Sequence, residues 1–280
     1  MKILLIPNDN QKSKEVALRL IKIFNSHGDA ILMPDSFSDR FEGEAEFLSE
    51  EACFENADIC VVLGGDGAVL HAGKNAALYD VPVIAVNTGR VGFLAALEGC
   101  DADGIYEAIN ESRGEKRTML EVKVVSSDGK EIFSDIALNE AVISRGEISR
   151  IIEIALSVNG KEINSVRGDG VVIATPTGST AYSMSAGGPI LSPEVSAMTV
   201  TPICPYTLAA RATVLPDDAE ISASLSGLGD SSAILTVDGN SPYSLEEDVK
   251  VIFRRSEKTL TLLMAEDAFY EKIKTKLFGV

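Results

Sequence analysis

One carboxylate set among three glycines is the most chemically informative feature of this sequence. The segment GGDG at 64–67 follows the apolar, strand-like run Ile59–Leu63 and precedes an expected helix over 68–77. Glycines let a backbone approach a phosphate closely, and the N–H groups that open a helix point towards an anion. A loop that only bound anions would not carry Asp66, so this carboxylate indicates a group that handles a hydroxyl proton or a magnesium–phosphate complex. The alternative is a plain tight turn.

A second segment, TPTGSTAYS at 175–183, is dense in hydroxyl side chains and follows the strand-like run 171–174. Proline and glycine set its turns, and such a loop can offer donors and acceptors to sugar, amide and base edges. It could equally be a surface turn that caps a helix through Ser179 or Thr180. Between the two loops, the Asn-Glu pair at 139–140 interrupts an apolar strand pattern, either as a bulge at a sheet edge or as a ligand contact.

In this order the segments resemble the NAD kinase family, and the resemblance spans about residues 58 to 240. It rests on GGDG at 64–67, NTGRVGFL at 87–94, Asn-Glu at 139–140, the block 169–190, CPYTL at 204–208 and DGN at 238–240. The GGDG loop alone also resembles lipid kinases of the diacylglycerol type and phosphofructokinases, whereas TPTGSTAYSMSAGGPI is far more diagnostic. Ala68 and Ala95 stand where the family usually has Thr, and Tyr206 where many members have His. None of these departures removes a carboxylate.

The resemblance implies a phosphotransferase that moves the γ-phosphoryl group of ATP to the 2′-hydroxyl of the adenosine ribose of NAD. It gives Asp66 the role of contacting that hydroxyl and accepting its proton. Other matching positions are Gly64, Gly65 and Gly67 for backbone approach to substrate and donor phosphates, Asn139, Glu140, Asp169 and Asp238 for the dinucleotide, and Thr177, Thr180, Ala181, Tyr182 and Ser185 for the adenine and ribose. A divalent cation such as Mg²⁺ is expected on the ATP phosphates and not in a protein cage. The resemblance also implies a homodimer or homotetramer, in which Asp169 and Asp238 could act from a neighbouring subunit.

Two alternatives stay open. A lipid or sugar kinase would share the GGDG loop and need a wide apolar acceptor pocket or a sugar-phosphate site, and it leaves the 175–183 segment unexplained. A dinucleotide-binding sensor without catalysis would be favoured by a replacement of Asp66, which is present.

Composition sets further limits. An apolar share of 45% and a charged share of 24% over 280 residues are those of an ordinary globular protein of about two domains. Four scattered cysteines argue against a zinc site and against a disulfide scaffold, and favour a reducing cytoplasm. No apolar run reaches the roughly 18 residues of a membrane span, and Met1–Pro7 is expected to be a buried strand and not a signal peptide.

The net charge of −17 argues against a nucleic-acid partner. An acidic protein that binds polyphosphates must offset repulsion locally, and Arg90, Arg167 and Arg211 lie in or beside the matched segments. The acidic cluster 42–55 is expected to be a solvated helix face or loop, and His71 a residue on a helix surface.

The pattern of elements predicts two domains. Strand-like runs at 2–6, 30–33, 59–63 and 81–86 alternate with helices at 14–26 and 68–77, which predicts an α/β domain with a parallel sheet over 1–117. Its ligands should lie beyond the carboxyl ends of the strands. From 118 to 264, short strands separated by turns predict an antiparallel β domain: 120–125, 131–136, 151–158, 221–225, 233–237, 249–253 and 260–264. A C-terminal helix over 266–277 is expected to return, within 265–280, to the first domain.

Overall fold

The computed structural model describes residues 1–41, 45–89, 92–98, 102–146, 150–226, 232–265 and 268–279. The chain divides into two compact units, Met1–Arg117 with Lys258–Val280, and Thr118–Glu257. Arg90, Cys100 and part of the acidic cluster lie outside the described residues. No helix in the described ranges is both long and apolar enough to cross a membrane.

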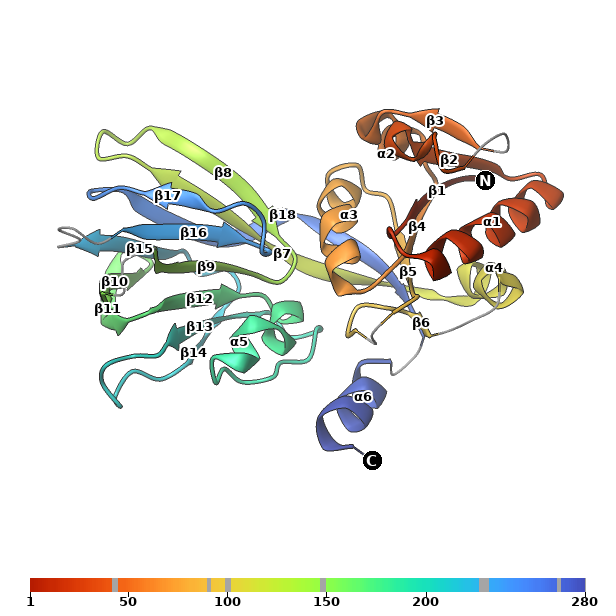
Figure 1. The fold of residues 1–280 in the computed structure, drawn as a ribbon. Coiled ribbons are helices and arrows are strands. Elements are labelled where there is room, and N and C mark those ends of the chain that lie inside the picture. The colour runs from red at the N-terminus through yellow and green to blue at the C-terminus, as the bar shows by residue number, and fades with distance from the viewer. Residues whose placement is uncertain are drawn as a thin grey trace. The chain divides into compact units, whose positions relative to one another are not determined.

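The first unit contains the predicted parallel sheet (Figure 1). Its strands lie in the order β3-β2-β1-β4-β5, with β6 beside β5, and each neighbouring pair is parallel. The bounds are β1 Lys2–Pro7, β2 Ala30–Pro34, β3 Glu46–Leu48, β4 Ile59–Leu63, β5 Val83–Asn87 and β6 Leu97–Glu98. All five residues of β4 and of β5 are buried, as expected for strands covered on both faces.

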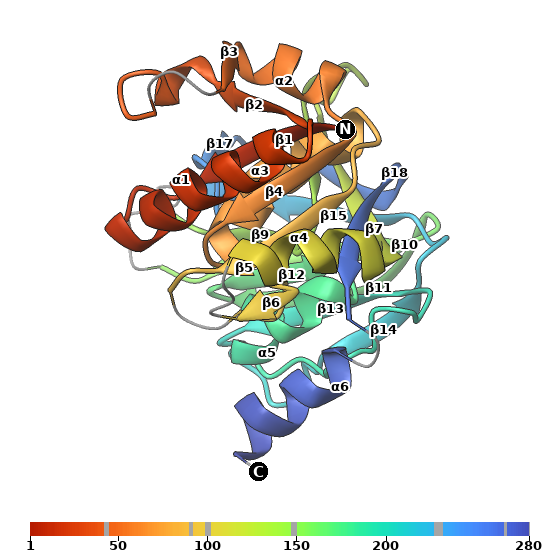
Figure 2. The ribbon, with the colours of Figure 1, turned by 90° about the vertical axis from the view of Figure 1, so that its right-hand side faces the viewer.

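Helices cover this sheet on two faces (Figure 2). Alternate strand residues such as Ile3, Leu5 and Val61 share a core with α1 and α4, whereas α2 and α3 contact β1, β4 and β5. The bounds are α1 Gln11–Ser26, the 3₁₀ turn η1 Asp35–Phe37, α2 Glu50–Asn56, α3 Asp66–Leu78 and α4 Ala102–Glu111. Helix α1 begins earlier than predicted because Asn10 caps it by accepting the Ser13 N–H at 2.8 Å.

The second unit is the predicted antiparallel β structure. One sheet has the order β14-β13-β12-β9-β16-β17, and β10 pairs with β11 and β15. The bounds are β7 Arg113–Val125, β8 Glu131–Ala137, β9 Glu140–Arg145, β10 Ile152–Val158, β11 Lys161–Gly168, β12 Gly170–Ala174, β13 Ala197–Ile203, β14 Thr213–Pro216, β15 Ile221–Ser226, β16 Ala233–Val237, β17 Tyr243–Leu245 and β18 Lys250–Met264. One apolar core takes alternate residues from β9, β12 and β16 and from β7, β10 and β15, as the period of two of a strand requires. The opposite face of β9 and β12 is buried as well.

Towards the C-terminus, two further elements differ from their predictions. Except for residue 249, segments 249–253 and 260–264 belong to the single strand β18, because the residues between them stay extended instead of turning, although the consecutive exposed residues Arg254 and Arg255 interrupt the alternation. Its start pairs with β15, and Leu262 pairs in parallel with Val83 of β5. At the C-terminus, α6 spans Ala268–Ile273 and continues as the π-helical turn η3, Lys274–Phe278; residues 266 and 267 of the expected helix lie outside the described residues.

Candidate functional site

The GGDG loop joins the carboxyl end of β4 to α3, at the edge of a parallel sheet where ligands bind. Gly65 occupies the N-cap position of α3, so Asp66 is the first residue of the helix. The helix therefore begins two residues before its predicted start. A carboxylate is favourable in the first turn because the helix dipole is positive there, and the half-buried Asp66 keeps access to solvent.

The carboxylate of Asp66 is held by the backbone of a segment that follows β5. Oδ2 accepts the N–H of Phe93 at 2.8 Å, and Oδ1 accepts the N–H of Leu94 at 3.0 Å. Each carboxylate oxygen can accept a second hydrogen bond. The two backbone donors therefore fix the orientation of the carboxylate and leave both oxygens able to accept from another group. The role of the segment NTGRVGFL at 87–94 could not be predicted from sequence, because backbone donors leave no signature in residue type.

A second carboxylate group lies in the second unit, where Glu140 opens β9. That strand is internal, since it pairs with β12 and with β16 without a register shift, which excludes a bulge at a sheet edge. Asp238, in the turn after β16, adopts a positive φ of 48°. Its carboxylate accepts the N–H groups of Leu138, Asn139 and Glu140 at 2.6, 2.8 and 3.1 Å.

The environment of Glu140 opposes its charge. Burial, followed by the nearby charge of Asp238, raises the pKa of Glu140 from 4.5 to about 7, although the N–H of Tyr182 acts in the opposite direction. Burial also raises the pKa of Asp238 against the effect of its three backbone donors. Oε2 of Glu140 is buried with no hydrogen-bond partner among the described residues. Buried oxygens normally have a donor, so this atom has capacity to accept one further hydrogen bond.

The hydroxyl-rich segment 175–183 packs directly against the backbone at Leu138 and Asn139. The Thr175 hydroxyl donates to Leu138 O at 2.5 Å, and the Thr175 N–H donates to Asn139 O at 2.9 Å. Gly178 has no room for a side chain, since a Cβ there would lie 2.1 Å from Asn139 O. The segment forms the 3₁₀ turn η2, Thr177–Thr180, and the short helix α5, Tyr182–Ser185.

The alternative of a helix-capping surface turn is wrong for this segment. The hydroxyls of Ser179 and Thr180 donate to carbonyls of their own turn, and α5 has no side-chain cap. Thr177 and Thr180 are buried, whereas Tyr182 and Ser185 are exposed and Ala181 lies between these extremes. The structure therefore brings Asn139, Glu140, Asp238 and the predicted 177–185 positions to one end of β9, β12 and β16.

Arg167 and Asp169 do not join that group within one chain. They precede β12, whereas Thr177 follows it, and one strand of five residues separates the two ends by on the order of 15 Å. Asp169 is paired with Arg145, whose Nε lies 2.7 Å from Oδ1. Arg167 is exposed, with its guanidinium 5.9 Å from the centre of the Tyr206 ring. Arg211 is exposed as well.

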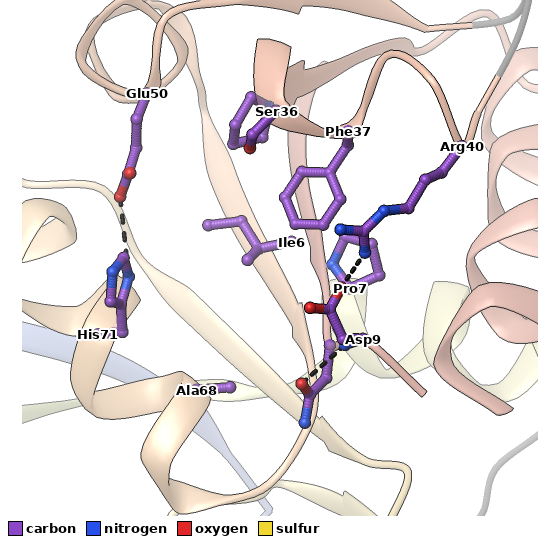
Figure 3. A pocket seen from close by; sticks show the side chains of 11 residues that line it. Ile6, Pro7, Asp9, Ser36, Phe37, Arg40, Glu50, Ala68 and His71 are labelled. Atoms are coloured by element: carbon purple, nitrogen blue, oxygen red, sulfur yellow. Dashed lines mark hydrogen bonds and ion pairs between the residues drawn. The ribbon is translucent and has the colours of Figure 1, made fainter. Parts of the chain in front are cut away.

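A cavity of about 470 Å³ opens in the first unit beside α3 (Figure 3). It lies at the carboxyl ends of β1 and β2, and its wall combines the apolar Ile6 and Phe37 with ion-paired polar groups. Arg40 pairs with Asp9 across its rim, and Nδ1 of His71 lies 3.8 Å from a Glu50 oxygen. Ala68, two residues after Asp66, also lines it. This cavity was not predicted from sequence, although the three polar residues at 8–10, directly after the first buried strand, indicate a ligand site at its carboxyl end.

His71 lies on the surface of α3, with 70% of its side chain exposed. Within the described ranges, no group of three or more His, Cys, Asp or Glu side chains is arranged to hold a metal ion.

Two family models cover most of the chain. Residues 3–114 match the ATP-NAD kinase N-terminal domain, and residues 138–264 match the ATP-NAD kinase C-terminal domain. The NAD kinase of Natranaerobius thermophilus is 34% identical over 98% of this chain and 97% of its own length. That of Caldanaerobacter subterraneus subsp. tengcongensis is 36% identical over 99% of this chain and 98% of its own. The chain belongs to the NAD kinase family.

Solved structures of the NAD kinase family share its fold. A yeast NADH kinase complexed with NADH superposes with a TM-score of 0.88 at 24% identity, covering 100% of this chain and 87% of its own. An NAD kinase from Archaeoglobus fulgidus in complex with ATP gives a TM-score of 0.76 at 24% identity, covering 100% and 98%. Family membership confirms the predicted phosphotransferase activity of an NAD kinase, and nothing in these comparisons favours a lipid kinase, a sugar kinase or a sensor.

Proposed function

We propose that Asp66 is the base of this NAD kinase reaction. The carboxylate takes the proton of the adenosine 2′-hydroxyl as that oxygen attacks the γ-phosphorus of ATP. The bond from the γ-phosphorus to the β,γ-bridging oxygen breaks, and ADP leaves with its electron pair, giving NADP. The observation that carries this proposal is the fixed carboxylate of Asp66 at the first turn of α3, oriented by two backbone donors.

The acceptor is recognised by residues of the second unit. Asn139 and Glu140 contact the dinucleotide, and Oε2 of Glu140, which lacks a partner among the described residues, accepts a ribose hydroxyl. Thr177, Thr180, Ala181, Tyr182 and Ser185 line the adenine and ribose pocket. The exposed Tyr182 ring supplies an aromatic face for a base, and such stacking adds affinity beyond the area it buries.

The donor nucleoside occupies the cavity of the first unit, and Gly64, Gly65 and Gly67 let the backbone approach the phosphates. A volume of about 470 Å³ lies in the range of small-molecule sites. Phe37 and Ile6 offer an apolar wall to a purine, and Asp9 and Glu50 supply acceptors for its amino group and ribose hydroxyls. This placement makes ATP, with its nucleoside, a better donor than an inorganic polyphosphate.

The residues present fit a magnesium ion carried on the ATP phosphates. Mg²⁺ is commonly held by one or two carboxylates together with substrate phosphates and water, and both oxygens of Asp66 retain acceptor capacity. When bound, the ion would neutralise part of the charge that develops on the transferred phosphoryl group. Asp66 and the N-terminus of α3 orient the reacting groups.

We further propose a cytoplasmic homodimer or homotetramer. Asp169 and Arg167 match positions near the dinucleotide, yet they lie at the opposite end of β12 from Thr177. A second copy of the chain could supply them. Light scattering at micromolar concentration should detect a species of at least twice the 29.8 kDa chain mass, and a purely monomeric enzyme with full activity would contradict this assembly. The free thiols of Cys53, Cys60 and Cys204 support a reducing compartment such as the cytoplasm.

The test of the function is direct. Purified protein is incubated with ATP, magnesium chloride and NAD, and NADP is measured with an NADP-specific dehydrogenase. NADP formation that requires NAD, ATP and magnesium together supports the proposal. Turnover of a diacylglycerol or a sugar phosphate without NADP formation would overturn it.

A further inference from the structure

A buried lysine of the C-terminal segment donates hydrogen bonds to the loop whose backbone N–H groups bind the carboxylate of Asp66. Lys272 lies in α6 and is 9% exposed. Its Nζ donates to Phe93 O at 2.8 Å and to Ala95 O at 2.5 Å. Burying an ammonium group is costly unless its protons are hydrogen-bonded, and both carbonyls belong to the segment whose amides hold the carboxylate. All of these groups lie in the first unit.

One peptide group connects Lys272 to Asp66. The carbonyl of Phe93 and the N–H of Leu94 belong to the same peptide unit. Its oxygen accepts from Lys272, and its N–H donates to Oδ1 of Asp66 at 3.0 Å. Hydrogen bonds in such a chain polarise one another, so a cation at the oxygen strengthens the donor at the nitrogen. The planarity of the peptide means that fixing the oxygen also fixes the direction of the N–H.

We propose that Lys272 is a positioning residue that orients the carboxylate of Asp66 through the Phe93–Leu94 peptide. The proposal rests on the assignment of Asp66 as the base. The second carbonyl contact, at Ala95, gives Nζ of Lys272 another fixed partner in the same segment. Lys276 contacts the same loop through the side chain of Phe93, with its Nζ 4.8 Å from the centre of that ring.

The experiment compares three variants of the full-length enzyme. Lys272→Met keeps most of the aliphatic stem and removes the donors, Lys272→Arg restores a cation with donors, and Lys274→Met is a matched charge control on an exposed residue of the same segment. Hydrogen exchange is measured for the amides of Phe93 and Leu94. Steady-state kinetics give kcat and the KM for NAD, and calorimetry gives the affinity for NAD.

For Lys272→Met we expect faster exchange of the two amides and a kcat about 10- to 100-fold lower, since a misplaced catalytic group costs up to about 100-fold. A positioning role changes kcat and leaves NAD affinity within about twofold. Lys272→Arg should retain more of the amide protection and more of the kcat than Lys272→Met, and Lys274→Met should match the parent in both.

The proposal requires kcat and amide protection to change together. Protected amides with a lowered kcat, or exposed amides with an unchanged kcat, overturn it in any folded variant. Where Lys272→Met fails to fold, the same comparison on Lys272→Gln, which also removes the cation, decides. A parent enzyme that makes no NADP would refute the proposed function alone, because the exchange measurement tests the Lys272 contact without any turnover.

Discussion

The carboxylate of Asp66 occupies the space in which a side chain at position 92 would lie. A Cβ built at position 92 would lie 1.7 Å from Oδ1 of Asp66 and 2.2 Å from its Cγ. The GGDG loop and the segment that contains residue 92 can therefore pack together only when residue 92 has no side chain. The backbone N–H groups of the next two residues, Phe93 and Leu94, donate to the same carboxylate. Position 92 requires glycine because the carboxylate of Asp66 approaches its Cα closely. Backbone conformation is not the reason, since the φ of Gly92 lies outside the left-handed region.

Gly92→Ala should lower kcat at least about 10-fold, because the carboxylate must move to make room and a misplaced catalytic group is costly. The KM for NAD should change far less. Gly89→Ala is the matched control, since a Cβ there meets nothing within 4 Å. Equal kcat values for the two variants would show that the position of Asp66 does not limit the reaction.

Asp66→Asn should lower kcat by on the order of 10²–10⁴, the usual loss for a general base, while calorimetry shows NAD affinity nearly unchanged. The structure adds a second expectation. The amide NH₂ of asparagine would face one of the two backbone N–H donors, so the melting temperature should fall modestly. Turnover within a few-fold of the parent would reduce Asp66 to a structural role.

Glu140→Gln should make stability less dependent on pH. The unfolded chain releases this proton near pH 4.5 and the folded chain near 7. Between these values the folded state binds more protons, so this group's contribution to stability falls as the pH rises. Above pH 7, ionisation of Glu140 in its buried site lowers the free energy of unfolding by on the order of 3 kcal/mol, and glutamine removes that cost. The variant should therefore exceed the parent in free energy of unfolding by more at pH 8 than at pH 5.

Urea unfolding at those two pH values measures the effect of Glu140→Gln. Glu162→Gln, at an exposed position of β11, is the control and should show no such trend. A Glu140→Gln variant whose gain over the parent is the same at pH 5 and pH 8 would contradict the buried, proton-binding role of Glu140.

Asn139→Ala and Tyr182→Ala should raise the KM for NAD by about 10-fold, since leaving a ligand group unpaired costs about 1–3 kcal/mol, with little change for ATP. The backbone of Asn139 is fixed from both sides, by Asp238 and by Thr175, so truncation should not move the loop. Ile163→Ala, an exposed apolar truncation on β11, controls for surface effects. Parent-like KM values in both variants would place the adenosine pocket elsewhere.

Phe37→Ala should raise the KM for ATP about 10-fold through lost contact with the purine, while the KM for NAD stays near the parent value. Activity with inorganic tripolyphosphate, which has no nucleoside, should be unaffected. Because Phe37 also packs against the core, the melting temperature of the variant must be recorded. Equal losses with both donors would argue that the cavity does not hold the nucleoside.

Much of the first unit could be predicted from local patterns. The apolar run Ile59–Leu63 followed by glycines identifies a buried strand and a phosphate-type loop, because burial and backbone freedom depend on the residues themselves. The turn Asn159-Gly160 likewise shows the positive φ values, 50° and 76°, that a tight hairpin demands. The order of the motifs was enough to indicate the NAD kinase family.

Contacts between distant segments were decided only by the tertiary structure. Asp66 meets Leu94 28 residues along the chain, Asp238 meets Asn139 at a separation of 99, and Lys272 meets Phe93 at 179. Two of these contacts use backbone N–H groups and the third a backbone carbonyl, all of which every non-proline residue carries. Residue type therefore marks which carboxylates are present, whereas the path of the chain determines which amides orient them and how far burial shifts their pKa values.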